Sequence, residues 1–348
     1  MSARLRTLLV GLGARGRYWA QVLQAEPRCD LVAYVDPDPE ALARACASFG
    51  VRSAFASLEA ALATVDAVEA LVLATPPQGR EAQIEIACDH GLAVLVEKPL
   101  ALDLAEAARF VARTEQAGIP LMVGLNFRYL AVTDERMRLY RDGVVGPPAF
   151  ARFTYERWRD GHRPGINRYP LTMAQPMLWE QSVHHFDLLR YVYGREPETV
   201  VCRSWNPPWS MYEGDANVTA LLTFEGGMVV NYHGTWQANW SIPGFEWRSE
   251  CAEGVVTQFD QFGELRYARR GDPELTRVEL PPHETWVTET AALLRAFVGA
   301  VRDGRPLECS GRDHLRSLAM VAACIESSRE RTVVDVPTVL QETVAVAP

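Results

Sequence analysis

A glycine-rich hexapeptide near the start of the sequence is the first set of residues whose types and spacing could do chemistry. It reads Gly11-Leu12-Gly13-Ala14-Arg15-Gly16 and joins an expected strand over residues 5–10 to an expected helix over residues 14–25. In such a G-x-G-x-x-G pattern the first glycine permits a tight turn, the second lets the backbone approach a pyrophosphate, and the third lets the helix pack on the strand. The N–H groups at the start of the helix then attract the phosphates. All six residues are therefore candidates for binding a dinucleotide.

An acidic residue stands where such a loop needs one. Asp36 lies 20 residues beyond Gly16, after the next expected strand over residues 30–35. Its carboxylate would accept hydrogen bonds from the adenosine ribose hydroxyls, whereas a 2′-phosphate would meet its negative charge. Residues 37–43 contain no Lys or Arg to offset that charge. The pattern favours NAD over NADP; the alternative is a glycine-rich turn in an α/β protein that binds no nucleotide.

A second candidate motif, Glu97-Lys98-Pro99, directly follows an expected strand over residues 92–96. Ligands of doubly wound sheets bind beyond the carboxyl ends of the strands, so we expect Lys98 to project into the cofactor crevice. A solvated loop is the alternative for the same three residues.

The elements that must position these residues alternate regularly up to about residue 122. Short, uninterrupted apolar runs indicate strands buried on both faces, and the segments between them have helical periodicity. This alternation predicts a parallel, doubly wound sheet, with strands over residues 5–10, 30–35, 70–74, 92–96 and 119–123 and helices over 14–25, 39–49, 80–90 and 104–117.

The second half of the chain has a different rhythm of strands and turns. Residues 216–224 and 228–236 flank Gly226-Gly227 and predict a hairpin in an antiparallel or mixed sheet. Helices are expected over residues 132–141 and 177–193, a strand over 149–158, and two final helices over 286–303 and 313–329. We therefore predict two domains, 1–124 and 125–348.

Composition and charge exclude several classes of function. The chain has 348 residues and a formal net charge of −9, so a nucleic-acid partner is not expected. No apolar stretch approaches the roughly 20 residues of a membrane helix, and we expect no export signal. Seven scattered cysteines without a C-x-x-C pair suit a reducing cytoplasm. No cluster has metal-ligand spacing, so no metal is predicted.

Several motifs, taken in order, carry a family resemblance. After the glycine loop and Glu97-Lys98-Pro99 come Gly124-Leu125-Asn126-Phe127-Arg128-Tyr129, Glu180-Gln181-Ser182-Val183-His184-His185-Phe186-Asp187 and Gly304-Arg305-Pro306 with Ser310-Gly311. Together they resemble the Gfo/Idh/MocA family, the relatives of glucose–fructose oxidoreductase and inositol dehydrogenase, over essentially the whole chain. The resemblance implies a Rossmann domain followed by an α/β domain with a large open, mostly antiparallel sheet, through which subunits form homodimers or homotetramers.

The resemblance also implies catalytic residues. They are Lys98 and a helical D-x-x-x-H pair, here Glu180 and His184, with glutamate in place of the usual aspartate. On an α-helix this spacing places both side chains on one face. His184 would take a proton from a substrate alcohol while Lys98 stabilises the developing alkoxide. We expect these two side chains to converge at the nicotinamide; a buried core histidine is the alternative for His184.

Contacts with ligands follow from the same resemblance and from the local sequence. The resemblance assigns cofactor contacts to Thr75, Pro76, Glu97, Lys98 and Asn126 and substrate contacts to Lys98, His184 and Arg128. Trp158 leads into an arginine-rich loop that includes Arg163; an aromatic face suits a sugar, and a guanidinium could hold an anionic group. A packed tryptophan and a solvated basic loop are the alternatives.

The expected activity is NAD-dependent transfer of a hydride between nicotinamide and a secondary alcohol of a sugar, inositol or related polyol. One alternative is a glycoside hydrolase that retains NAD and oxidises its substrate transiently. The other is a regulator that binds NAD without turnover, against which Lys98 and His184 argue. Fold alone does not choose among these.

Overall fold

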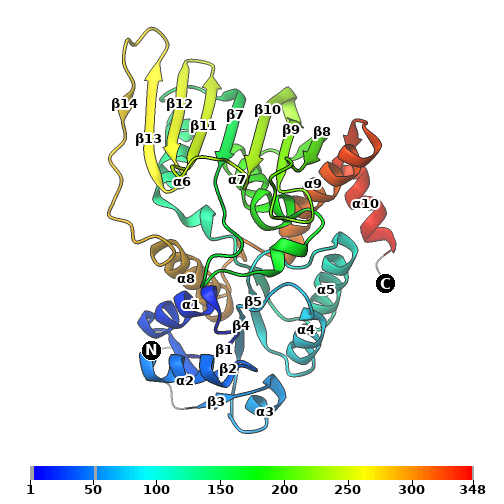
Figure 1. Cartoon of the computed structure of the whole chain (residues 1–348). Coiled ribbons are helices and arrows are strands. Elements are labelled where there is room, and N and C mark those ends of the chain that lie inside the picture. The colour runs from blue at the N-terminus through cyan, green and yellow to red at the C-terminus, as the bar shows by residue number, and fades with distance from the viewer. Residues whose placement is uncertain (1–3, 51–52, 347–348) are drawn as a thin grey trace. The chain divides into compact units, whose positions relative to one another are not determined.

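The computed structural model describes residues 4–50 and 53–346, which form two compact units (Figure 1). The first contains the described residues up to Asn126, then Glu284–Leu315 and the described residues from Thr343 onward; the second contains Phe127–His283 and Arg316–Glu342. These units differ from the predicted continuous ranges, because α8 (Thr288–Asp303) and the beginning of α9 (Gly311–Glu330) return to the first unit. The roles predicted for the two ranges stay predictions.

The first unit is built on a parallel, doubly wound sheet, as predicted. Its six strands are hydrogen-bonded in the order β3-β2-β1-β4-β5-β6. The strand order reverses between β1 and β4, which is the switch point where such sheets bind ligands. The strands are β1 (Leu5–Val10), β2 (Cys29–Val35), β3 (Ala54–Phe55), β4 (Ala70–Leu73), β5 (Ala93–Val96) and β6 (Leu121–Val123).

Helices connect these strands, and α2 and α5 each begin at an aspartate that caps the helix. The Asp38 side chain accepts a hydrogen bond from the N–H of Glu40, and the Asp103 side chain accepts one from Glu106. The helices are α1 (Ala14–Ala25), α2 (Pro39–Phe49), α3 (Leu58–Leu62), α4 (Arg80–Asp89) and α5 (Leu104–Gln116), with α8 packed against α1. The short elements β3 and α3 were not predicted because neither is long enough to show a period.

The second unit contains a nine-stranded sheet in the order β14-β13-β12-β11-β7-β10-β9-β8-β15. Adjacent strands run antiparallel, except that β7 and β10 are parallel to each other. The antiparallel pairing of β9 with β10 confirms the predicted hairpin. The strands are β7 (Pro148–Glu156), β8 (Pro197–Trp205), β9 (Asn217–Phe224), β10 (Met228–Thr235), β11 (Gly244–Cys251), β12 (Gly254–Asp260), β13 (Gly263–Arg269), β14 (Thr276–Arg277) and β15 (Val334–Asp335).

One expectation about the helices is wrong, and another is confirmed with a different helix type in its first turn. Two helices were expected to end the chain, but α10 (Val336–Val346) follows β15; Pro337 in its first turn reads like a loop residue, yet proline is well tolerated there. The expected helix over residues 177–193 begins with a π-helical turn, η3 (Met177–Ser182), before α7 (Val183–Tyr193). The remaining helical elements are η1 (Asn126–Tyr129), α6 (Ala131–Arg141), η2 (Tyr169–Thr172) and η4 (Glu225–Gly227).

Side chains alternate across the nine-stranded sheet between a buried and an exposed face. In β9, Leu222 is fully buried whereas Leu221 is 43% exposed, and Phe150 of β7 and Val201 of β8 are exposed as well. The predicted homo-oligomer through this sheet stays a prediction. Within the described residues, no helix combines the length and the apolar character that crossing a membrane would require.

Candidate functional site

The carboxyl edge of the first unit's sheet gathers the predicted cofactor residues. The glycine loop follows β1, Asp36 follows β2, Thr75 lies just past β4, and Lys98 lies just past β5. Hydrogen bonds extend the strand ladder into these segments, from Gly11 N–H to the Val35 carbonyl (2.8 Å), from Ala74 N–H to Val10 (2.8 Å) and from Glu97 N–H to Leu73 (2.9 Å). Because parallel strands end at one edge, the sheet brings these chemically different residues together.

The glycine loop has the shape that a dinucleotide needs. A Cβ on Gly16 would lie 2.1 Å from the Gly11 carbonyl oxygen, and Gly11 has a φ of +90°, so both positions require glycine. By contrast, a Cβ on Gly13 would meet no described residue within 4 Å other than its chain neighbours. None of the described side chains caps α1 at Gly13. Open space beside uncapped N–H groups suits a pyrophosphate.

The Asp36 carboxylate is fixed beside this loop. One oxygen accepts the N–H of Leu12 at 2.7 Å, and the other accepts the N–H of Asp38 at 2.8 Å. Each carboxylate oxygen has a second lone pair, so the group can still accept hydrogen bonds from ribose hydroxyls. The residues of this edge therefore fit NAD.

Glu97 lies at the same edge, but its side chain is buried within the unit. Its Oε1 accepts hydrogen bonds from Arg15 Nε (2.9 Å) and from the Trp19 indole (2.8 Å). Burial raises the pKa of Glu97. The charges of Arg15 and Lys98 and these hydrogen bonds lower it by more than burial raises it, so the pKa of Glu97 lies below its ordinary value. Glu97 thus stays ionised and holds Arg15; direct cofactor contacts by the two residues stay predictions.

The other predicted cofactor residues of this unit differ in their burial and contacts. Lys98 is half-buried and is joined to Pro99 by a cis peptide bond. Thr75 Oγ1 donates a hydrogen bond to Gln83 Oε1 at 2.9 Å, while Pro76 is exposed. The Asn126 side-chain amide donates to Glu289 Oε1 at 3.2 Å.

In the second unit, His184 occupies the first turn of α7. Its imidazole stacks on the Phe127 ring, with 4.2 Å between ring centroids and 25° between planes. This contact, which the sequence analysis missed, orients the ring without using either of its nitrogens.

The neighbouring His185 has a different environment. Its Nε2 accepts a hydrogen bond from the Gln181 amide (3.0 Å), and its Nδ1 lies 2.8 Å from the Tyr232 hydroxyl, which itself donates to Ser182. Burial lowers the pKa of His185 to about 3, so the ring is neutral. These contacts make His185 a structural residue of the core.

Glu180 lies in the π-helical turn η3 rather than in regular α-helix. Its Oε1 accepts a 2.7 Å hydrogen bond from the hydroxyl of Tyr169, a residue of η2 that sequence reasoning missed. Turns of π-helix interrupt the α-helical register and are frequent at functional sites. The predicted one-face relation between Glu180 and His184 therefore does not follow from α-helical geometry.

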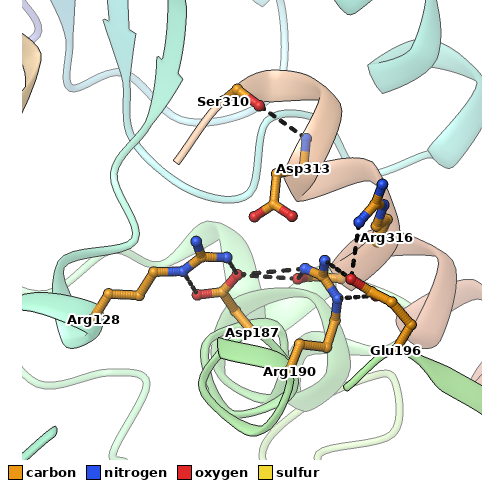
Figure 2. A network of polar contacts seen from close by, with 8 residues as sticks. Arg128, Asp187, Arg190, Glu196, Ser310, Asp313 and Arg316 are labelled. Atoms are coloured by element: carbon orange, nitrogen blue, oxygen red, sulfur yellow. Dashed lines mark hydrogen bonds and ion pairs between the residues drawn. The ribbon is translucent and has the colours of Figure 1, made fainter. Parts of the chain in front are cut away.

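Arg128 forms a buried ion pair with Asp187 (Figure 2). Its Nε and Nη2 reach the two carboxylate oxygens at 2.7 and 2.5 Å, and Ser317 Oγ donates to the same carboxylate at 3.1 Å. Because Arg128 follows Phe127 directly, the pair fixes the segment that stacks on His184. Asp187 is thus linked to His184 by contacts through Arg128 and Phe127, and a substrate contact by Arg128 stays a prediction.

Asp187→Asn is expected to lower the free energy of unfolding by about 3 kcal/mol, because it leaves the buried Arg128 guanidinium without its carboxylate. Urea unfolding followed by circular dichroism measures the change. The matched control is Asp142→Asn, which removes an exposed contact with Arg138 and should cost under about 1 kcal/mol. Equal stability losses in the two variants would contradict the assignment.

Two arginines of the arginine-rich loop, Arg159 and Arg163, differ in their surroundings. Arg159 donates to the Tyr212 hydroxyl at 3.0 Å and lies 4.5 Å from the centroid of Trp236, so it holds the loop together. Arg163 is exposed, and Trp158 is 40% exposed beside β7. Substrate contacts by Trp158 and Arg163 stay predictions.

Comparison with family models gives two consecutive matches. Residues 5–125 match the model described as an oxidoreductase family with an NAD-binding Rossmann fold. Residues 136–250 match the model described as the GFO/IDH/MocA C-terminal domain.

Individual relatives match along most of the chain. A D-apiose dehydrogenase of Paraburkholderia graminis is 27% identical over 99% of this chain and 92% of its own length. An inositol 2-dehydrogenase of Leifsonia xyli is 31% identical, covering 85% of this chain and 86% of the relative. The crystal structure of an oxidoreductase from Agrobacterium radiobacter with NAD+, L-tartaric acid and magnesium has the same fold, with a TM-score of 0.88, 21% identity and coverage of 97% of this chain and 99% of that one.

Proposed function

This chain belongs to the Gfo/Idh/MocA family of oxidoreductases, and from that premise we propose that it is an NAD-dependent dehydrogenase of a secondary alcohol on a sugar, inositol or related polyol. One observation carries the proposal: a glycine loop that fits a pyrophosphate and a lysine, Lys98, that could stabilise an alkoxide follow strands of the same sheet at the same edge. The relatives named for D-apiose and inositol support a polyhydroxylated substrate.

The first unit supplies cofactor binding in this proposal. Residues 11–16 bind the pyrophosphate, Asp36 accepts the ribose hydroxyls, and the segment containing Thr75 and Pro76 contacts the nicotinamide half. When bound, NAD supplies a ring that accepts a hydride from the substrate carbon. The protein's own contribution is to fix positions and charges around the reacting groups.

His184 and Lys98 are assigned to the substrate hydroxyl. A ring nitrogen of His184 takes the hydroxyl proton, a task for which histidine suits neutral pH because its unperturbed pKa is about 6.5. The Lys98 ammonium donates a hydrogen bond to the same oxygen as it gains negative charge. Glu180, held by Tyr169, is assigned to fixing the substrate or the imidazole.

A substrate panel tests the activity. The purified protein is incubated with NAD and sugars, polyols and sugar acids, including D-apiose and inositol, while the absorbance of reduced nicotinamide is followed. Formation of NADH with one substrate class supports the proposal. Release of reducing sugar from glycosides without net NADH would identify a glycoside hydrolase, and NAD binding without any turnover would identify a regulator.

Asp36 is expected to make NAD the preferred coenzyme. The wild-type kcat/KM with NAD should exceed that with NADP about 100-fold or more, because a 2′-phosphate placed beside the carboxylate costs several kcal/mol. Asp36→Ser should reduce this ratio at least about tenfold.

Asp38→Asn is the control, since Asp38 lies two residues away, caps α2 and can still accept the Glu40 N–H as asparagine. The ratio of its kcat/KM with NAD to its kcat/KM with NADP should match that of the wild type. Equal use of the two coenzymes by the wild-type protein would refute the role of Asp36.

A further inference from the structure

Arg80 occupies an unusual position for a cation. It is the first residue of α4, where the positive end of the helix dipole disfavours a positive side chain. Its side chain is nevertheless turned inward and only 1% exposed. Burying a guanidinium is costly unless its donors are used, and a departure from local preference of this kind is typical of functional sites.

The buried guanidinium bridges two separate segments of the sheet edge. Nη2 donates to the Thr75 carbonyl at 2.6 Å, just past β4. Nη1 donates to the carbonyl of Pro99 and, at 3.1 Å, to that of Leu100, just past β5. A planar fork places donors on separate nitrogens in fixed directions toward the two segments, whereas the three donors of an ammonium group share one freely rotating nitrogen.

These contacts restrain the backbone on which the proposed chemistry depends. The Pro99 carbonyl belongs to the residue directly after Lys98. Leu100 is held from both sides, because its N–H donates to His314 Nε2 at 3.4 Å while its carbonyl accepts from Arg80. The Thr75 carbonyl lies in the segment assigned to the nicotinamide half of the cofactor.

We propose that Arg80 is a positioning residue that fixes Lys98 and Thr75 relative to each other, so that the lysine ammonium meets the alkoxide at the correct place. This inference rests on the proposed dehydrogenase function. In the protein without cofactor, Arg80 likewise keeps the segment from Glu97 onward from opening.

The test compares Arg80→Met and Arg80→Lys with the wild type. For R80M we expect kcat to fall about 100-fold, the effect of misplacing a catalytic group by roughly 1 Å. For R80K, which keeps the charge but not the fork, we expect a fall of about tenfold. The dissociation constant of NAD, measured by calorimetry, should change less than about threefold, because the glycine loop and Asp36 are untouched.

A second readout does not depend on activity. Amide hydrogen exchange in the cofactor-free protein should become faster in peptides covering residues 97–104 of R80M. The matched control is Arg136→Met, which removes the other large, fully buried arginine; it contacts Trp247, Ser249 and Gln258 in the second unit. R136M should lower Tm but leave kcat and the exchange of residues 97–104 unchanged.

The outcomes separate this inference from the proposed function. Wild-type exchange over residues 97–104 in R80M, or faster exchange with unchanged kcat, would overturn the positioning role. Failure of the dehydrogenase proposal would instead appear as a wild-type protein that reduces NAD with no substrate on the panel. If R80M does not fold, R80K carries the same measurements.

Discussion

Replacing His184 by asparagine is expected to lower kcat/KM for the alcohol substrate about 10²- to 10⁴-fold, the usual contribution of a general base. Asparagine keeps a polar side chain of similar reach but cannot take a proton near neutral pH. NAD affinity should be unchanged, because the proposed cofactor residues belong to the other unit. The effect would therefore separate proton transfer from coenzyme binding.

The pH dependence gives this experiment a second signature. A histidine base must be neutral to accept the proton, so the wild-type kcat/KM should rise with pH as the imidazole loses its proton. H184N should lose that rise. His90→Asn is the control, because His90 is an exposed histidine at the end of α4. Full turnover by H184N with a wild-type pH profile would remove His184 from the mechanism.

Gly16→Ala is expected to damage both folding and coenzyme binding. The new methyl group would lie 2.1 Å from the Gly11 carbonyl oxygen and 2.9 Å from its carbonyl carbon. These are backbone atoms, so the helix must move away from the strand at a cost of about 3 kcal/mol or more. We expect Tm to fall by about 5–10 °C in a thermal scan. NAD affinity should fall with it, because the N–H groups of α1 move.

Gly13→Ala supplies the matched comparison within the same loop. A Cβ at this position would lie within 4 Å of none of the described residues, its chain neighbours apart. Stability should therefore stay close to that of the wild type, while NAD affinity falls at least about tenfold as the methyl group occupies the pyrophosphate position. Equal Tm values for G16A and wild type, or unchanged NAD affinity in G13A, would contradict the loop assignment.

The regular elements of the first unit were predictable because their signals are local. The bounds of β1, α1 and α2 match the predicted ranges, since an apolar run marks the strand, helical periodicity marks the two helices, and turn residues lie between them. The positions of the glycine loop after β1 and of Asp36 after β2 were predictable as well. Their spacing along the chain follows from the strand–turn–helix–strand unit that carries them.

Other features of the candidate site had no local signal. The hydrogen bond from Tyr169 to Glu180 joins two helical turns that the sequence separates by a loop. The pairing of Arg128 with Asp187 spans 59 residues, and Arg80 bridges segments that are adjacent only because β4 and β5 pair. Each contact depends on which segments become neighbours in the folded chain, and the hydrophobic periodicity of a sequence does not predict that.

Local pattern was thus sufficient for the doubly wound sheet, the strand–turn–helix that carries the glycine loop and the family to which the chain belongs. Folding added the contacts that restrain those residues: the carboxylate of Glu97 turned inward to Arg15 and Trp19, the ring of His184 stacked on Phe127, and Arg80 buried beneath two strand ends. The physical reason is that backbone propensities and turn geometry act over a few residues. Burial of a polar or charged group instead requires partners, and only the packed chain supplies them.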